Sequence, residues 1–278
     1  MSSSKPLKSK NAIDEIAFIV LFEKELDDKA LFSLLELQNE FASTLPSFDI
    51  VKVVKMHVDH QNPQMPVTKP GGILCSKPSE FQKDRVEWSV RVESNKILVA
   101  CSEFDSWERI WPIAKEYLFT TVRKFNLLKN PVKEVVFNCV DKFIYQGDPE
   151  GYQVSDVFNL ASRFLTKNVI DLNSPSWHIH QGWFLFPSSG TIQALHNLNI
   201  NVFTPDEKPH ETTISHQIKV RRENGDPIKE IDLFLGVDGR EGYLERSMVQ
   251  CHDSNKGVLQ GLLCPEMLEA ISLEKGAL

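Results

Sequence analysis

Three regularities in the amino-acid sequence predict an α+β fold built from two topologically similar units. Residues 86–101 alternate apolar and polar side chains around a Ser94-Asn95-Lys96 turn, which is typical of a β-hairpin. Residues 107–128 carry one apolar stripe at helical spacing. The same order of strand, helix, four strands and helix begins again at Val132. We therefore expect antiparallel sheets that are each covered by a long helix, an arrangement similar to the helix-grip fold.

This repeat sets the expected domain boundaries. Residues 1–11 are a basic leader that we expect to be disordered, residues 12–130 form the first α+β unit, and residues 131–278 form the second. The residues of the two halves do not align, so the predicted duplication is one of topology.

The first unit begins with an apolar run that predicts a strand buried on both faces. Turn residues and a change of hydrophobic period mark the elements that follow. These are strand 12–23, helix 29–43, strand 48–57, strand 72–76, the hairpin strands 86–92 and 97–101, and helix 107–128. The proline-rich stretch 58–72 is predicted to be a functional or mobile loop.

The second unit shows the same kinds of signal. We expect strand 132–145, helix 154–166, strands 176–186, 192–203, 212–222 and 229–237, helix 243–263, and a last helix from Pro265 to about Leu273. Strand 176–186 holds two tryptophans and two alternate histidines, and it is the stretch in which chemistry is most expected.

Three short patterns resemble a sporadically distributed, uncharacterised family of mid-sized bacterial proteins. They are the opening Ala12-Ile-Asp-Glu-Ile-Ala-Phe, the Trp107-Glu-Arg-Ile-Trp motif before the long helix, and Val140-Asp-Lys-Phe143 at the end of a strand. The resemblance implies a bacterial source and no established activity. It transfers no functional residue to this chain.

Composition narrows the functional classes. The formal net charge of −7 argues against a nucleic-acid partner, since non-specific affinity for nucleic acid comes mostly from Lys and Arg. The five cysteines form no C-x-x-C pair, so we expect free thiols and a reducing compartment. No secretory segment and no run of about 18 apolar residues is present, which predicts a cytoplasmic protein without membrane contact.

Histidines are the main candidate ligands. Strand parity places His178 and His180 on one face, and it places His196 and His216 on the apolar faces of the next two strands. His252 approaches from the covering helix. These residues predict a ring of imidazoles that holds a transition metal such as zinc. The alternative is that they are core histidines hydrogen-bonded to their neighbours. No carboxylate has the right strand parity to complete a facial triad of metal ligands, which favours this alternative.

Basic residues are the candidates for partner binding. Lys219, Arg221 and Arg222 are expected on a polar strand face that could meet an acidic partner. Arg240 lies in a glycine-containing turn before a helix, where it could help to bind an anion. A solvated face and a simple turn are the alternatives.

The leading expectation is a non-enzymatic binding or sensor protein that acts through a macromolecular partner, in a bacterial defence or accessory system. It predicts no catalytic residue, no cofactor and a protein partner, and it leaves homo-oligomerisation open. The first alternative is a metal-dependent enzyme or metalloprotein that uses the histidine cluster. The second is a carrier that holds an apolar small molecule between sheet and helix.

Overall fold

The computed structural model describes residues 4–8, 10–55, 67–124, 130–172, 174–185, 192–205, 209–222, 225–237 and 240–273. Its strands are β1 (Ser4–Pro6), β2 (Ile13–Phe22), β3 (Ser47–Lys55), β4 (Val67–Pro78), β5 (Val86–Glu93), β6 (Lys96–Cys101), β7 (Val132–Tyr145), β8 (Trp177–Leu185), β9 (Ile192–Phe203), β10 (Glu211–Arg222), β11 (Gly236–Val237) and β12 (Arg240–Glu241). Its helices, with 3-10 helices written η, are α1 (Asp28–Ser33), η1 (Leu34–Glu36), α2 (Leu37–Phe41), α3 (Trp107–Lys124), η3 (Pro149–Gly151), η4 (Val154–Asp156), α4 (Lys167–Leu172), α5 (Ile231–Leu235), α6 (Tyr243–Leu262) and α7 (Pro265–Ala270).

Ten of the strands form one large antiparallel sheet. Their order is β3-β4-β5-β6-β2-β7-β10-β9-β8, with β1 pairing with the end of β7. β2 and β7 pair directly, from Ile16 opposite Cys139 to Val20 opposite Val135. The predicted fold of two topologically similar strand–helix units, each covered by a long helix, is therefore wrong, because this pairing joins the strands of both halves into one sheet.

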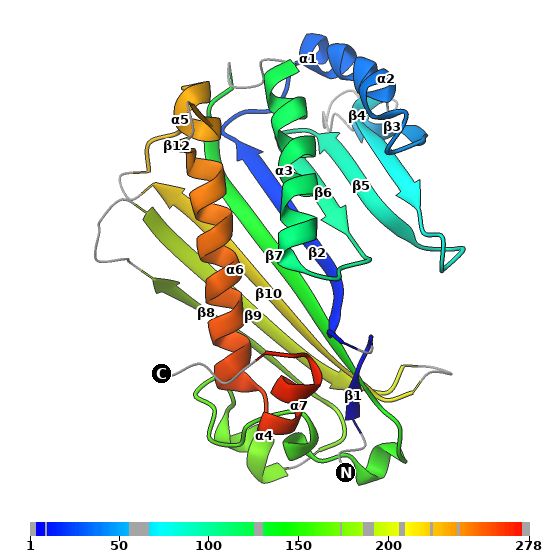
Figure 1. The fold of residues 1–278 in the computed structure, drawn as a ribbon, viewed down its shortest axis with the longest axis vertical. Helices are drawn as coiled ribbons and strands as arrows, with labels where there is room; N and C mark the ends of the chain where they lie inside the picture. The colour runs from blue at the N-terminus through cyan, green and yellow to red at the C-terminus, as the bar shows by residue number, and fades with distance from the viewer. Residues whose placement is uncertain are drawn as a thin grey trace, which may run out of the picture.

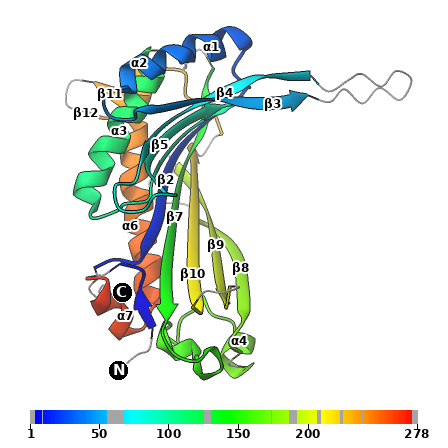
Figure 2. The same ribbon diagram turned by 90° about the vertical axis from the view of Figure 1, so that its right-hand side faces the viewer.

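The helices α3 and α6 lie against one face of this sheet, and α7 follows at the end of α6 near both chain termini (Figure 1). Figure 2 shows the sheet edge-on, with β3 and β4 bending away from the helix layer. Within the described residues, no helix combines the length and the apolar character that crossing a membrane requires.

Two apolar clusters fill the space between the sheet and the helices. In the first, Phe18 of β2 contacts Trp111 of α3 with ring centroids 5.4 Å apart, and Phe137 of β7 packs beside them. In the second, Ile214 of β10 and Leu262 of α6 are fully buried among residues from α7 and from the segment 152–165. Each such side chain contributes about 2 kcal/mol when it is removed from water.

Two further predictions about elements are wrong. The segment 154–166 is not one helix but η4 followed by turns, because its polar side chains bind their own backbone: Asn159 accepts from the amide of Ala161, and Ser162 accepts from that of Phe164. The expected strand 229–237 instead contains α5, which ends at Gly236 with a φ of 88°.

The predicted loop 58–72 is also shorter than expected. β4 begins at Val67 and pairs with Lys55 of β3, so residues 67–72 belong to the sheet. The remainder of that loop, residues 58–66, lies outside the described residues.

Candidate functional site

The four histidines predicted to form a ring lie on opposite faces of the sheet. His178 and His180 are exposed, whereas Ile179 between them is buried against the second apolar cluster. The parity predicted for this strand is therefore reversed. Trp177 and Trp183 decide it, because they pack on Phe158 and Phe164 of the segment beneath the strand.

His196 and His216 do come together. Nδ1 of His196 lies 3.0 Å from Nε2 of His216, and both side chains are only 1% exposed. The two residues lie diagonally on adjacent strands, since His216 is directly opposite Leu198 and His196 is directly opposite Ile218. Trp183 stacks on His196, with ring centroids 5.0 Å apart.

Hydrogen bonds continue from His216 to the centre of the sheet. Nδ1 of His216 lies 2.9 Å from Oδ1 of Asn255, a buried residue of α6. The side-chain amide of Asn255 also lies beside the thiol of Cys139, which is directly opposite His216 on β7. Cys139 in turn donates to Oδ2 of Asp141 across 3.7 Å. The result is a buried polar chain that runs His196, His216, Asn255, Cys139, Asp141.

The direction of these bonds follows from the acceptor at the end of the chain. A carboxylate only accepts, so Cys139 donates to Asp141. An amide oxygen also only accepts, so Nδ1 of His216 donates to Oδ1 of Asn255, and Nε2 of His216 accepts from Nδ1 of His196. We assign both imidazoles as neutral Nδ1-H tautomers on this basis.

Burial shifts the pKa of every titratable side chain in this polar series. Desolvation lowers the pKa of His196 and that of His216 to about 4, so both rings are neutral at pH 7. Desolvation also raises the pKa of Asp141 to about 7, and it raises the pKa of the Cys139 thiol well above its ordinary value. The carboxyl group of Asp141 is therefore poised between its two protonation states near neutral pH.

Asp141 borders a cavity of about 130 Å³ between the sheet and α6. The polar residues at the cavity are Asn11, Cys139, Asp141, His252, Asn255 and Lys256, and the others are apolar, including Ile16, Phe104, Phe137, Leu259, Ile271 and Leu273. Asp141, Cys139 and Asn255 are buried, whereas Lys256 is exposed. The cavity thus has a carboxyl group at its inner end and an ammonium group at its rim.

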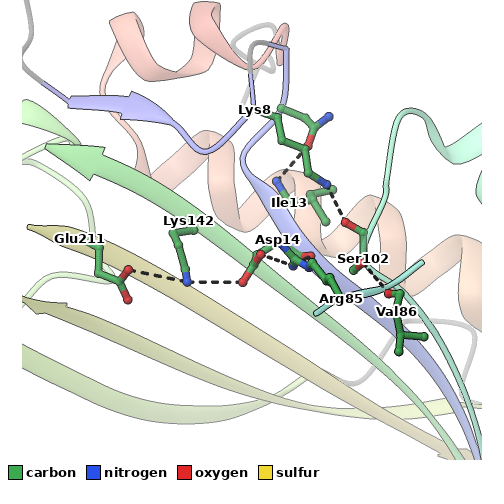
Figure 3. A network of polar contacts seen from close by, with 9 residues as sticks. Lys8, Ile13, Asp14, Arg85, Val86, Ser102, Lys142 and Glu211 are labelled. Atoms are coloured by element: carbon green, nitrogen blue, oxygen red, sulfur yellow. Dashed lines mark hydrogen bonds and ion pairs between the residues drawn. The ribbon is translucent and has the colours of Figure 1, made fainter. Parts of the chain in front are cut away.

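One wall of the cavity is formed by residues 11–13, and a network of polar contacts fixes this segment (Figure 3). The Asn11 amide donates to the carbonyl of Phe104 across 3.2 Å, and Lys8 donates to the carbonyl of Ser102 across 2.8 Å. On the next residues, Asp14 forms ion pairs with Arg85 and with Lys142, whose ammonium lies 3.4 Å from the Asp14 carboxylate. These contacts hold the start of β2 against β5 and β7.

His252 lies at the cavity and not in the histidine chain. Its ring stacks on Trp107 with centroids 4.1 Å apart, and Nδ1 lies 3.4 Å from the carboxylate of Asp253. In the part of the chain that the structure describes, no group of three or more His, Cys, Asp or Glu residues could hold a metal ion.

The predicted partner-binding residues are spread over the molecule. Lys219 and Arg221 lie on the sheet face opposite the helices, where Arg221 donates to the side chain of Gln193 across 2.7 Å. Arg222 has the parity of the buried residues of β10 and is half-buried on the helix-covered side. Arg240 is exposed in β12. The four residues therefore do not form one patch.

Asp141 was not among the residues predicted from the sequence, although the pattern of β7 contains a signal for it. The alternate residues of β7 read Val135, Phe137, Cys139, Asp141, Phe143 and Tyr145, and all of them are buried. A lone carboxylate in such an apolar series indicates a buried charge, which proteins seldom retain without a partner.

No protein-family model, no curated protein and no solved structure matches this chain.

Proposed function

We propose that this protein is a non-enzymatic binding or sensor protein that holds a small molecule in the cavity beside Asp141. This proposal combines two of the functions expected from the sequence, the sensor protein and the carrier of a small molecule. The cavity between the sheet and α6 supports it, because ligand sites are commonly apolar cavities with a few convergent polar groups.

The observation that carries the proposal is the incomplete pairing of the Asp141 carboxyl group. It is 2% exposed, and its one hydrogen-bond partner among the described residues is the weak thiol donor of Cys139. Burying a carboxylate without a partner costs several kcal/mol. A ligand that binds Asp141 would recover this free energy, whereas a purely structural core position would be more stable with an apolar residue.

The size and lining of the cavity fit a compact ligand. A cavity of about 130 Å³ is close to the roughly 150 Å³ that accommodates a benzene-sized molecule. Residues far apart in the sequence, Ala12 and Leu273, both border it.

The free edge of the sheet at β3 supports a protein partner as the recipient of the signal. β3 pairs only with β4 among the described strands, and Ile50 and Val54 on it are 44% and 61% exposed. An extended segment of another protein could pair with such an edge. An Ile50→Lys variant should then lose binding to the partner while its melting temperature stays unchanged.

The ligand proposal is tested by filling the cavity. Ile271→Trp places a large ring at the cavity, and Ile113→Trp on α3 is the matched control because Ile113 is partly exposed and lies away from the cavity. Thermal shift with neutral, cationic and anionic small molecules of benzene size is the measurement. We expect at least one class to stabilise the wild type and the control but not Ile271→Trp. No stabilisation by any class, or equal stabilisation of Ile271→Trp, would overturn the proposal.

A further inference from the structure

The least satisfied buried group at the cavity is an acceptor, the carboxyl group of Asp141. The Asn11 side chain already donates to Phe104 and accepts from the amide of Ile13. Oδ1 of Asn255 accepts from Nδ1 of His216, and the Cys139 thiol donates to Asp141. Asp141 is the buried carboxyl group at the cavity, and its one hydrogen-bond donor among the described residues is this weak thiol. A ligand group that donates would complete the hydrogen bonding of Asp141.

The charge near Asp141 favours a cation as the donor. Lys142 is next to Asp141 in sequence but alternates to the other sheet face, where its ammonium lies 3.4 Å from Asp14 and 3.7 Å from Glu211. Arg85 is paired with Asp14, and Lys8 donates to a carbonyl oxygen. No cation of the described chain is paired with the Asp141 carboxylate, so an ammonium group from a ligand would compensate a charge that the protein leaves uncompensated.

Lys256 is an exposed member of the cavity lining and carries an ammonium group of its own, which disfavours a second cation on the ligand beside it. The carboxylates of Glu108 and Asp253 lie near His252 and reduce this repulsion in part. The remaining lining is mostly apolar, with Phe104 and Phe137 among it, and it would surround an apolar body.

From these contacts we propose that the ligand class of this cavity is a compact monoamine, with one ammonium group that binds Asp141 and an apolar body about the size of benzene. This inference rests on the proposed function and names the chemistry that the site recognises. The ammonium donates to the free oxygen of Asp141, while the thiol of Cys139 and the polar chain behind it hold the carboxylate in place.

Calorimetric titration with four probes tests the ligand class: benzylamine, benzyl alcohol, benzoate and 1,4-diaminobutane. The proteins are the wild type, Asp141→Asn, and Asp232→Asn as the matched control, since Asp232 is an exposed carboxylate on α5 and does not line the cavity. At pH 8 we expect benzylamine to bind the wild type and the control at least tenfold more tightly than it binds Asp141→Asn. We also expect it to bind the wild type at least tenfold more tightly than any other probe does. The melting temperature of each variant verifies that it is folded.

The remaining outcomes separate this inference from the proposed function. If benzyl alcohol or benzoate binds as tightly as benzylamine, and Asp141→Asn binds equally well, the monoamine is overturned while the cavity remains a ligand site. If benzylamine binds but Ile271→Trp binds it just as tightly, the amine occupies another place and the inference fails. If no probe binds the wild type, both the inference and the proposed function fail.

Discussion

His196 and His216 share one hydrogen bond 3.0 Å long inside the sheet–helix core, and Trp183 covers the outer ring. The bond is possible because both rings are neutral: Nδ1 of His196 carries a proton and donates it, and Nε2 of His216 is unprotonated and accepts it. It connects an outer strand of the sheet, β9, to the central chain that ends at Asp141.

Substitution of His216 should destabilise the fold. His216→Leu removes the acceptor for His196 and the donor for Asn255, which leaves two buried polar groups unpaired. We expect a loss of about 3 kcal/mol in the free energy of unfolding. Denaturant titration measures this change. The control is His180→Leu at an exposed position of β8, where we expect a change within about 0.5 kcal/mol. Equal effects of the two variants would contradict the buried chain.

The neutral histidine pair should make the protein sensitive to acid. Both rings have a folded-state pKa of about 4, below the ordinary 6.5, so the unfolded chain binds protons that the folded protein does not. The contribution of these histidines to stability is full above pH 6.5 and is lost as pH falls from 6.5 to about 4. In His196→Phe the unfolding midpoint should depend less steeply on pH across this window. An unchanged slope would show that His196 is not held neutral.

Asp141 should make the free energy of unfolding depend on pH in the opposite direction. Its folded-state pKa of about 7 lies above the ordinary 3.8, so the folded protein retains a proton that the unfolded chain has released. This contribution is full below pH 3.8 and is lost as pH rises to about 7. As pH rises from 4 to 8, the free energy of unfolding of Asp141→Asn should therefore increase relative to that of the wild type, on the order of 4 kcal/mol. Chemical denaturation at both pH values measures the difference, and a difference independent of pH would refute the buried state of Asp141.

Asn255 should stabilise the buried polar series through its hydrogen bond with His216. Asn255→Leu leaves Nδ1 of His216 without an acceptor, and we expect it to cost about 2 kcal/mol in the free energy of unfolding. Asn197→Leu is the matched control, because Asn197 is half-buried on the opposite sheet face. Denaturant titration measures both variants, and an Asn255→Leu protein as stable as the wild type would contradict this role of Asn255.

Local patterns in the sequence predicted much of the sheet but not its assembly. Alternation correctly indicated β5, β6 and β10, since each of these strands buries one face. The pairing of β2 with β7 joins residues more than a hundred positions apart, and no local pattern encodes such a contact. For that reason the two expected units proved to be one sheet.

The candidate site was predictable in part. His196 and His216 share the buried faces of β9 and β10, as their apolar neighbours indicate. In β8 both faces carry large side chains, so parity could not be decided until the packing of Trp177 and Trp183 was known. The cavity depends on α6, α7 and residues 11–13 meeting over β7, which is a matter of tertiary structure.

The central claim is that the Asp141 carboxyl group binds the ammonium group of a ligand in the cavity. The most direct test is a carbon-13 NMR titration of this carboxyl group with and without saturating benzylamine. The neighbouring groups that titrate or carry charge are Glu108, Cys139, His252, Asp253 and Lys256, and Asp232→Asn protein serves as the reference. We predict an apparent pKa near 7 for the free protein and a value at least one unit lower with the amine. An Asp141 pKa near 3.8 in the free protein, or one that benzylamine leaves unchanged, would contradict the account.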